Sequence, residues 1–100
     1  MPFSQHIPKP FRQNDVRAFA PVTSGVYGIS SSREWIYIGE AADIQGALLS
    51  HFEDGRNSLM QHAPSGFVFE VCDGGTRQGR QDRLVSEYNP ACNRQTQRLS

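Results

Sequence analysis

The side chains best suited to contact a phosphate are the arginines near the C-terminal end of this sequence. Residues 77–98 contain two acidic side chains against five arginines, which are Arg77, Arg80, Arg83, Arg94 and Arg98. The net charge of the chain is zero, but a local cationic patch is enough for phosphate contacts. The alternative is an ordinary solvated helix face, and charge alone favours that alternative.

The cysteines and histidines do not predict a metal centre. Cys72 and Cys92 are too few for a disulfide framework and lack the paired spacing of a zinc site. His6 and His62 have no partner at ligand spacing. We therefore expect reduced thiols and surface histidines.

Length and composition are those of one small globular domain. The chain has 100 residues, of which 37% are hydrophobic and 20% are charged. It has no apolar run near the roughly 18 residues that a membrane span needs. Its first eleven residues hold three prolines and no apolar segment typical of a secretory signal. These features predict a cytoplasmic protein without membrane contact.

The elements that must position any site begin with a hairpin. Residues 24–29 and 35–39 are aromatic and β-branched runs separated by a polar loop, a pattern typical of two antiparallel strands. After Gly39 the apolar period changes, and the spacing of Ile44, Leu48 and His51 predicts an amphipathic helix.

A third strand and a closing helix follow. Residues 67–72 read as the strand, and residues 77–88 as a helix that Pro90 ends. Four prolines punctuate residues 1–24, which we expect to form an arm outside the core. The order predicts an α+β domain with a small, mainly antiparallel, three-stranded sheet flanked by helices.

Two short motifs ten residues apart resemble the paired motif of the GIY-YIG nucleases: Gly25-Val26-Tyr27 and Tyr37-Ile38-Gly39. The residues after Gly39 resemble the next helix of that family, and residues 84–93 resemble its closing helix and Pro-x-x-Asn loop. The family includes domains of the excision-repair incision subunit and of homing endonucleases. The resemblance defines a domain at 25–93, between an N-terminal arm (1–24) and a C-terminal tail (94–100).

The resemblance implies phosphodiester hydrolysis assisted by one divalent metal ion. In that interpretation Tyr27 and Tyr37 help to activate water, His51 shuttles a proton or donates to phosphate, and Asn93 supports the site. Without the motif, the tyrosines read as cross-strand packing partners. His51 reads equally well as a complement to a helix dipole. Asn93 alone reads as a loop cap.

The sequence departs from the family at two positions. Ala47 stands where the family has an arginine, one helical turn before His51, and Gln81 stands where it has the metal-binding glutamate. A neutral amide is a poor substitute for a carboxylate on Mg²⁺. Glu40, Asp82 and Glu87 are alternative carboxylates, although Asp82 is rotated about 100° from the inward stripe of its helix. We expect Tyr27, Tyr37, His51 and Gln81 to converge on one shallow groove, with Ala47 in its wall.

The sequence therefore predicts a GIY-YIG endonuclease-like domain whose metal-dependent hydrolysis is weak or lost. Its partner would be nucleic acid, with DNA preferred, contacted through Arg77, Arg80 and Arg83, and its cofactor Mg²⁺ or Mn²⁺ if it is active and otherwise none. One alternative is an active endonuclease that uses Glu40 or Asp82. The other is a non-catalytic protein-interaction module built on the same scaffold. Oligomeric state, pathway and substrate preference do not follow from the sequence.

Overall fold

A hairpin of two long strands forms the centre of the fold. The structure, a computed structural model, describes residues 8–53 and 61–93. β2 (Gly25–Ser30) pairs with β3 (Trp35–Ala41) in antiparallel register, with Tyr27 opposite Gly39 and Ile29 opposite Tyr37. Every residue of β2 is buried, because strands flank it on both sides.

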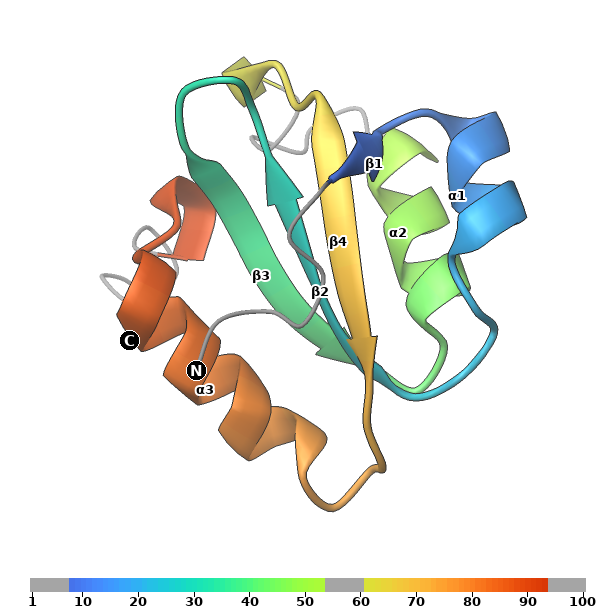
Figure 1. Cartoon of the computed structure of the whole chain (residues 1–100), viewed down its shortest axis with the longest axis vertical. Helices are drawn as coiled ribbons and strands as arrows, with labels where there is room; N and C mark the ends of the chain where they lie inside the picture. The colour runs from blue at the N-terminus through green and yellow to red at the C-terminus, as the bar shows by residue number, and fades with distance from the viewer. Residues whose placement is uncertain (1–7, 54–60, 94–100) are drawn as a thin grey trace.

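The described residues form a four-stranded antiparallel sheet in the order β1-β4-β2-β3 (Figure 1). β4 (Gly66–Val71) lies against β2, and β1 (Lys9–Pro10) pairs with the start of β4. The predicted α+β class is confirmed. The predicted count of three strands is wrong by one, because a two-residue strand is too short to show a period.

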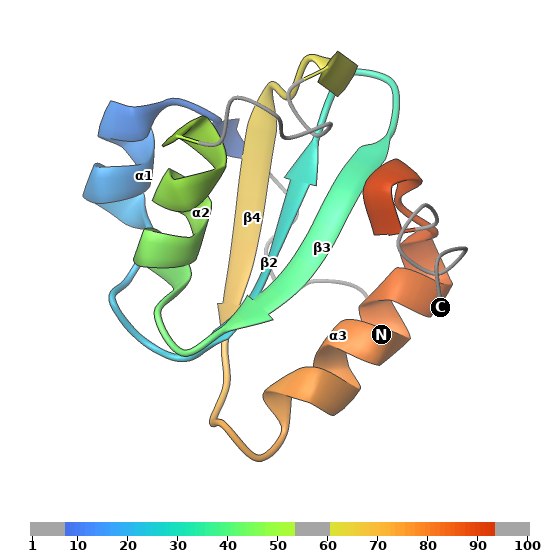
Figure 2. The same ribbon diagram turned by 180° about the vertical axis from the view of Figure 1, so that it is seen from behind.

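Helices cover both faces of the sheet (Figures 1 and 2). α1 (Gln13–Phe19) and α2 (Ile44–Glu53) lie side by side on one face, where ten buried residues form the larger core cluster. α3 (Arg77–Tyr88) lies on the other face, over a smaller cluster in which Leu84 packs with Val26, Ile38 and Val68. Within the described residues, no helix has both the length and the apolar character needed to cross a membrane.

The expectation that residues 1–24 lie outside the core is wrong for the part that the structure describes. Phe11, Val16 and Ala20 are buried in the larger cluster, and Phe11 stacks on Phe52 with ring centroids 4.4 Å apart. The segment belongs to the core because α1 packs against α2. Residues 1–7, which include His6, and the predicted tail at 94–100 lie outside the described residues.

Local signals fix the helix ends. The Asp43 carboxylate accepts the Gly46 N–H at 3.0 Å before α2, and the Asp73 carboxylate accepts the Thr76 N–H at 3.0 Å before α3. At the end of α3, Asn89 adopts a left-handed conformation with φ 52°, and its N–H bonds the Val85 carbonyl. Pro90 then prevents continuation of the helix. The segment after α3 then places Asn93 at the edge of β3.

Candidate active site

The two tyrosines of the hairpin share one face of the sheet. Their ring centroids are 6.1 Å apart, on the side covered by α2. Gly39 lies opposite Tyr27, and a Cβ at this position would come within 2.7 Å of the Tyr27 hydroxyl and 2.8 Å of Tyr37 Cε2. Such distances are shorter than real Cβ contacts allow. The glycine of the second motif is therefore what permits the rings to approach.

His51 reaches the same place from the last turns of α2. Its Nε2 lies 3.0 Å from the Tyr27 hydroxyl, and its ring centroid lies 5.5 Å from that of Tyr37. When His51 carries its proton on Nδ1, the Tyr27 hydroxyl donates to Nε2. The predicted convergence of these three side chains is confirmed. Their catalytic roles stay predictions.

The environment of the tyrosines favours their neutral forms. Burial raises the pKa of Tyr27 well above its ordinary value, and the nearby Tyr37 and Glu40 raise it further. Burial also raises the pKa of Tyr37, with smaller contributions from Cys92 and Glu40. Tyr27 is only 4% exposed. At neutral pH both side chains are therefore phenols that donate hydrogen bonds, and not phenolates.

Ala47 lies one turn before His51 and packs, half-buried, against the larger core cluster. Its methyl group brings no charge to this face. Position 47 therefore supplies no cation for a phosphate.

Two side-chain amides meet instead at the outer edge of β3. Asn93 accepts the Ile38 N–H through Oδ1 at 2.8 Å and donates from Nδ2 to the Ile38 carbonyl at 3.0 Å. Gln81 donates from Nε2 to the same carbonyl at 3.2 Å. The expectation that Gln81 joins the tyrosine groove is wrong. Its helix packs on the opposite face of the sheet, and its amide is bound to the strand edge.

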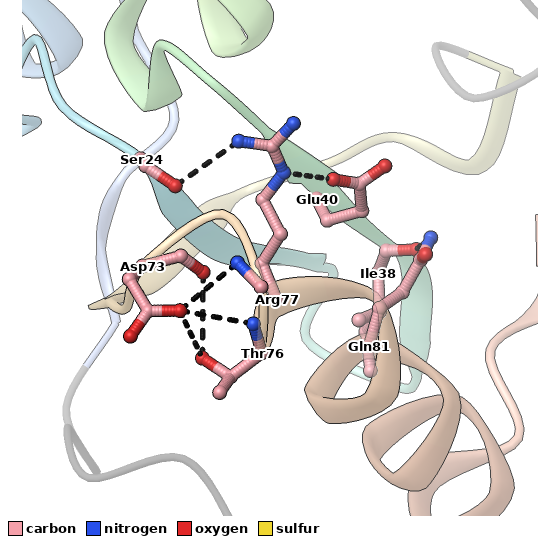
Figure 3. Close-up of polar contacts among 8 residues, drawn as sticks. Ser24, Ile38, Glu40, Asp73, Thr76, Arg77 and Gln81 are labelled. Atoms are coloured by element: carbon pink, nitrogen blue, oxygen red, sulfur yellow. Dashed lines mark hydrogen bonds and ion pairs between the residues drawn. The ribbon is translucent and has the colours of Figure 1, made fainter.

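The alternative carboxylates are on the α3 side of the sheet, although Glu40 is near enough to raise the pKa of both tyrosines. Tyr37 and Gly39 face α2, so the alternation of a strand turns Glu40 toward α3. There Glu40 accepts a hydrogen bond from Nε of Arg77, and Arg77 Nη1 donates to Ser24 Oγ at 3.1 Å. Figure 3 shows the Arg77 guanidinium between Ser24 and Glu40, with Gln81 beside Ile38. Asp82 and Glu87 are exposed on α3.

The side chains considered as metal ligands do not fit a divalent metal ion. Among residues 8–53 and 61–93, no three His, Cys, Asp or Glu side chains are grouped so that they could hold one. Gln81 directs its N–H, and not its oxygen, at the nearest carbonyl, and Glu40 already neutralises a guanidinium. Mg²⁺ requires oxygen ligands, usually with at least one free carboxylate.

The three arginines predicted to contact nucleic acid differ in their surroundings. Arg80 makes a two-pronged pair with Glu70, with N–O distances of 2.7 and 2.9 Å. Arg77 is held by Glu40 and Ser24, whereas Arg83 is exposed beside the groove between α3 and the end of β4. Arg94 and Arg98 lie outside the described residues.

Sequence reasoning missed the pairs that α3 makes with the sheet and the role of the Ile38 backbone. The face of Glu40 had a readable signal, since it is three residues from Tyr37 in a strand. Its partner had none, because Arg77 lies 37 residues further along the chain. Nothing local indicates that the Ile38 peptide would be bound by two amides.

The hairpin, the order of elements and the ring cluster together define a GIY-YIG endonuclease-type fold. Solved structures confirm it. The GIY-YIG N-terminal endonuclease domain of UvrC from Thermotoga maritima, bound to its catalytic divalent cation, magnesium, matches with a TM-score of 0.66 and 21% identity, over 76% of this chain and 92% of that chain. Two point mutants of that domain, also bound to its catalytic divalent cation, match with TM-scores of 0.65 and 0.66 at 21% identity, over 76% of this chain and 91% of theirs. Neither family models nor curated proteins match the sequence.

Proposed function

We propose that this protein is a cytoplasmic nucleic-acid-binding domain of the GIY-YIG type, acting on DNA, whose metal-dependent phosphodiester hydrolysis is weak or lost. The fold supports the nucleic-acid partner, because the UvrC domain that it resembles is an endonuclease. In this proposal residues 25–93 form the nuclease-like domain.

One observation supports the loss of hydrolysis: near the end of β3, no carboxylate is free to bind a metal ion among the described residues. Position 81 holds an amide bound to the Ile38 carbonyl, and Glu40 is paired with Arg77. Removing one donor that stabilises transition-state charge commonly costs about 10²–10³ in rate. A chain that lacks both the carboxylate and the arginine at position 47 should therefore cleave poorly.

The retained residues support contact with a phosphodiester. Tyr27, Tyr37 and His51 bring phenol and imidazole groups together, and we propose that they contact the phosphate or a water molecule beside it. Asn93 supports this site by holding the β3 backbone at Ile38. Because the phenols remain neutral, they serve as hydrogen-bond donors in this proposal and not as bases.

A plasmid-nicking assay with Mg²⁺, Mn²⁺ and chelator tests the proposal. The unmodified chain should show little or no cleavage. The double change Ala47→Arg with Gln81→Glu should restore measurable nicking, because it adds a cation on the ring face and a carboxylate at the β3 edge, where Gln81 bonds Ile38 next to Tyr37. Each single change should do less, because metal and arginine act on the same transition state. Binding of a labelled DNA duplex, measured in parallel, should weaken steeply as salt rises.

Each other result identifies another function. Robust cleavage by the unmodified chain that is lost in Glu40→Gln or Asp82→Asn would establish an active endonuclease with a relocated carboxylate. Neither cleavage nor DNA binding would leave a protein-interaction module.

A further inference from the structure

The Arg77 guanidinium is fixed at the end of the β2–β3 hairpin by two acceptors from different segments. Glu40 is near the end of β3, and Ser24 directly precedes β2. The register brings these positions together, because Gly25 pairs with Ala41 and Val26 with Glu40. α3 begins at Arg77 and projects its side chain between them (Figure 3).

Only part of this guanidinium is used by the protein. It has five N–H groups, of which Nε–H bonds Glu40 and one Nη1–H bonds Ser24. The other three have no hydrogen-bond partner within residues 8–53 and 61–93, and the side chain is 26% exposed. A planar group with free N–H donors matches the oxygens of a phosphate.

Arg80 shows what a purely structural arginine looks like in the same helix. Its Nε and Nη2 both bond the Glu70 carboxylate, and its side chain is only 16% exposed. Arg77 bonds its carboxylate through Nε alone and stays more exposed. The Arg77–Glu40 pair is part-buried, and it leaves more of the guanidinium open to a ligand than the two-pronged Arg80–Glu70 pair does.

The charge of Glu40 is met here by a side chain. A carboxylate at this strand end could serve as a metal ligand, but Glu40 is already paired with Arg77. We propose that Arg77 is a built-in cation that binds one phosphate of a nucleic-acid strand without a divalent metal, and that Glu40 is the positioning residue that orients it. This inference rests on the proposed nucleic-acid binding.

The first experiment measures binding of a fluorescein-labelled DNA duplex by anisotropy in EDTA across a salt series. Arg77→Gln should weaken binding about tenfold and lower the slope of log affinity against log salt by about one. Arg17→Gln is the matched control, because it removes the same charge from an exposed position on α1. It should change both quantities much less.

The second experiment separates orientation from charge by comparing Glu40→Gln with Glu40→Ala. Both changes remove the same negative charge, but only glutamine keeps an oxygen that accepts the Arg77 Nε–H. Glu40→Gln should bind at least as tightly as the unmodified chain, and Glu40→Ala several-fold more weakly than Glu40→Gln. Thermal unfolding of each variant checks that the fold is kept. Equal affinities for the two variants would overturn the positioning role.

The remaining outcomes tell the two proposals apart. If the unmodified chain binds DNA in EDTA and Arg77→Gln binds equally well, the role of Arg77 is overturned while nucleic-acid binding stands. If binding appears only when Mg²⁺ is added, the metal-free anchor is overturned. If the unmodified chain binds no DNA at low salt under either condition, the proposed function itself fails.

Discussion

The two faces of the sheet are built on different physical principles, although one strand contributes to both. On the α2 face, Tyr27, Tyr37 and His51 are held by ring packing and one hydrogen bond, and burial keeps the phenols neutral. On the α3 face, Arg77 and Arg80 are held by carboxylates. β3 supplies Tyr37 to the first face and Glu40 to the second.

The contrast shows how the chain divides its chemistry. Groups that could handle a proton are on the desolvated face, and groups that could hold a phosphate charge are on the more solvated face. They approach each other only near Gly39 and Glu40, where consecutive residues of β3 point to opposite sides. Glu40 is close enough to raise the pKa of both tyrosines. A substitution on one face can therefore be used to test whether the contacts on the other face change.

The largest effect should come from Gly39→Ala, which adds a methyl group between the two tyrosine rings. Overpacking of this kind typically costs about 1–3 kcal/mol, and chemical denaturation should report a loss in that range. The Tyr27–His51 contact should be disturbed, whereas the Arg80–Glu70 pair should persist. Unchanged stability would contradict the packing of Tyr27 and Tyr37 on Gly39 described here.

A smaller effect should follow from Gln81→Glu, which tests how α3 is attached to the sheet edge. The change replaces the N–H that bonds the Ile38 carbonyl with an oxygen, so unfolding free energy at neutral pH should fall by about 1 kcal/mol. The carbonyl should hold the pKa of the introduced carboxyl above its ordinary value. The lost stability should then return as the pH falls and the protonated acid donates to Ile38.

Gln78→Glu is the control for that experiment, because Gln78 is exposed on the same helix and the charge change is identical. Equal behaviour of the two variants between neutral and acidic pH would show that the Gln81 bond does not stabilise the fold.

The smallest effect should be a gain, from Gly79→Ala on α3. A Cβ at this position would meet no atom within 4 Å. Alanine in a helix is favoured over glycine by about 0.5–1 kcal/mol, so the melting temperature should rise. The same substitution would thus stabilise one face and destabilise the other. A loss of stability in Gly79→Ala would contradict the expected difference between the two glycine positions.

Much of this fold was predictable because its signals are local. The strand predicted at residues 24–29 is β2 at Gly25–Ser30, and the helix predicted at 77–88 has those bounds, since alternation and Pro90 act over a few residues. The convergence of Tyr27 and Tyr37 followed from the two-residue period of strands. β1 was missed because two residues carry no period.

The parts of the site that escaped prediction depend on how α3 lies relative to the sheet. The apolar stripe of the helix correctly predicted that Gln81 faces the protein interior. It did not predict that Gln81 would meet the edge of β3 and not the tyrosine face. The Arg77–Glu40 pair likewise depends on a helix and a strand joined through β4. Sequence patterns specify which face of an element is buried, and only the tertiary arrangement specifies what that face meets.

The amide of Asn93 has a consequence for solubility. An edge strand with free peptide groups is a template for pairing with another chain, and such pairing leads to aggregation. On β3, Asn93 satisfies both the N–H and the carbonyl of Ile38, much as a neighbouring strand would. At the opposite edge, β1 has only two residues, and one is Pro10, which has no N–H to offer. Each edge of the described sheet therefore has a place where strand addition is hindered: Ile38 on β3, and the start of β4 under β1.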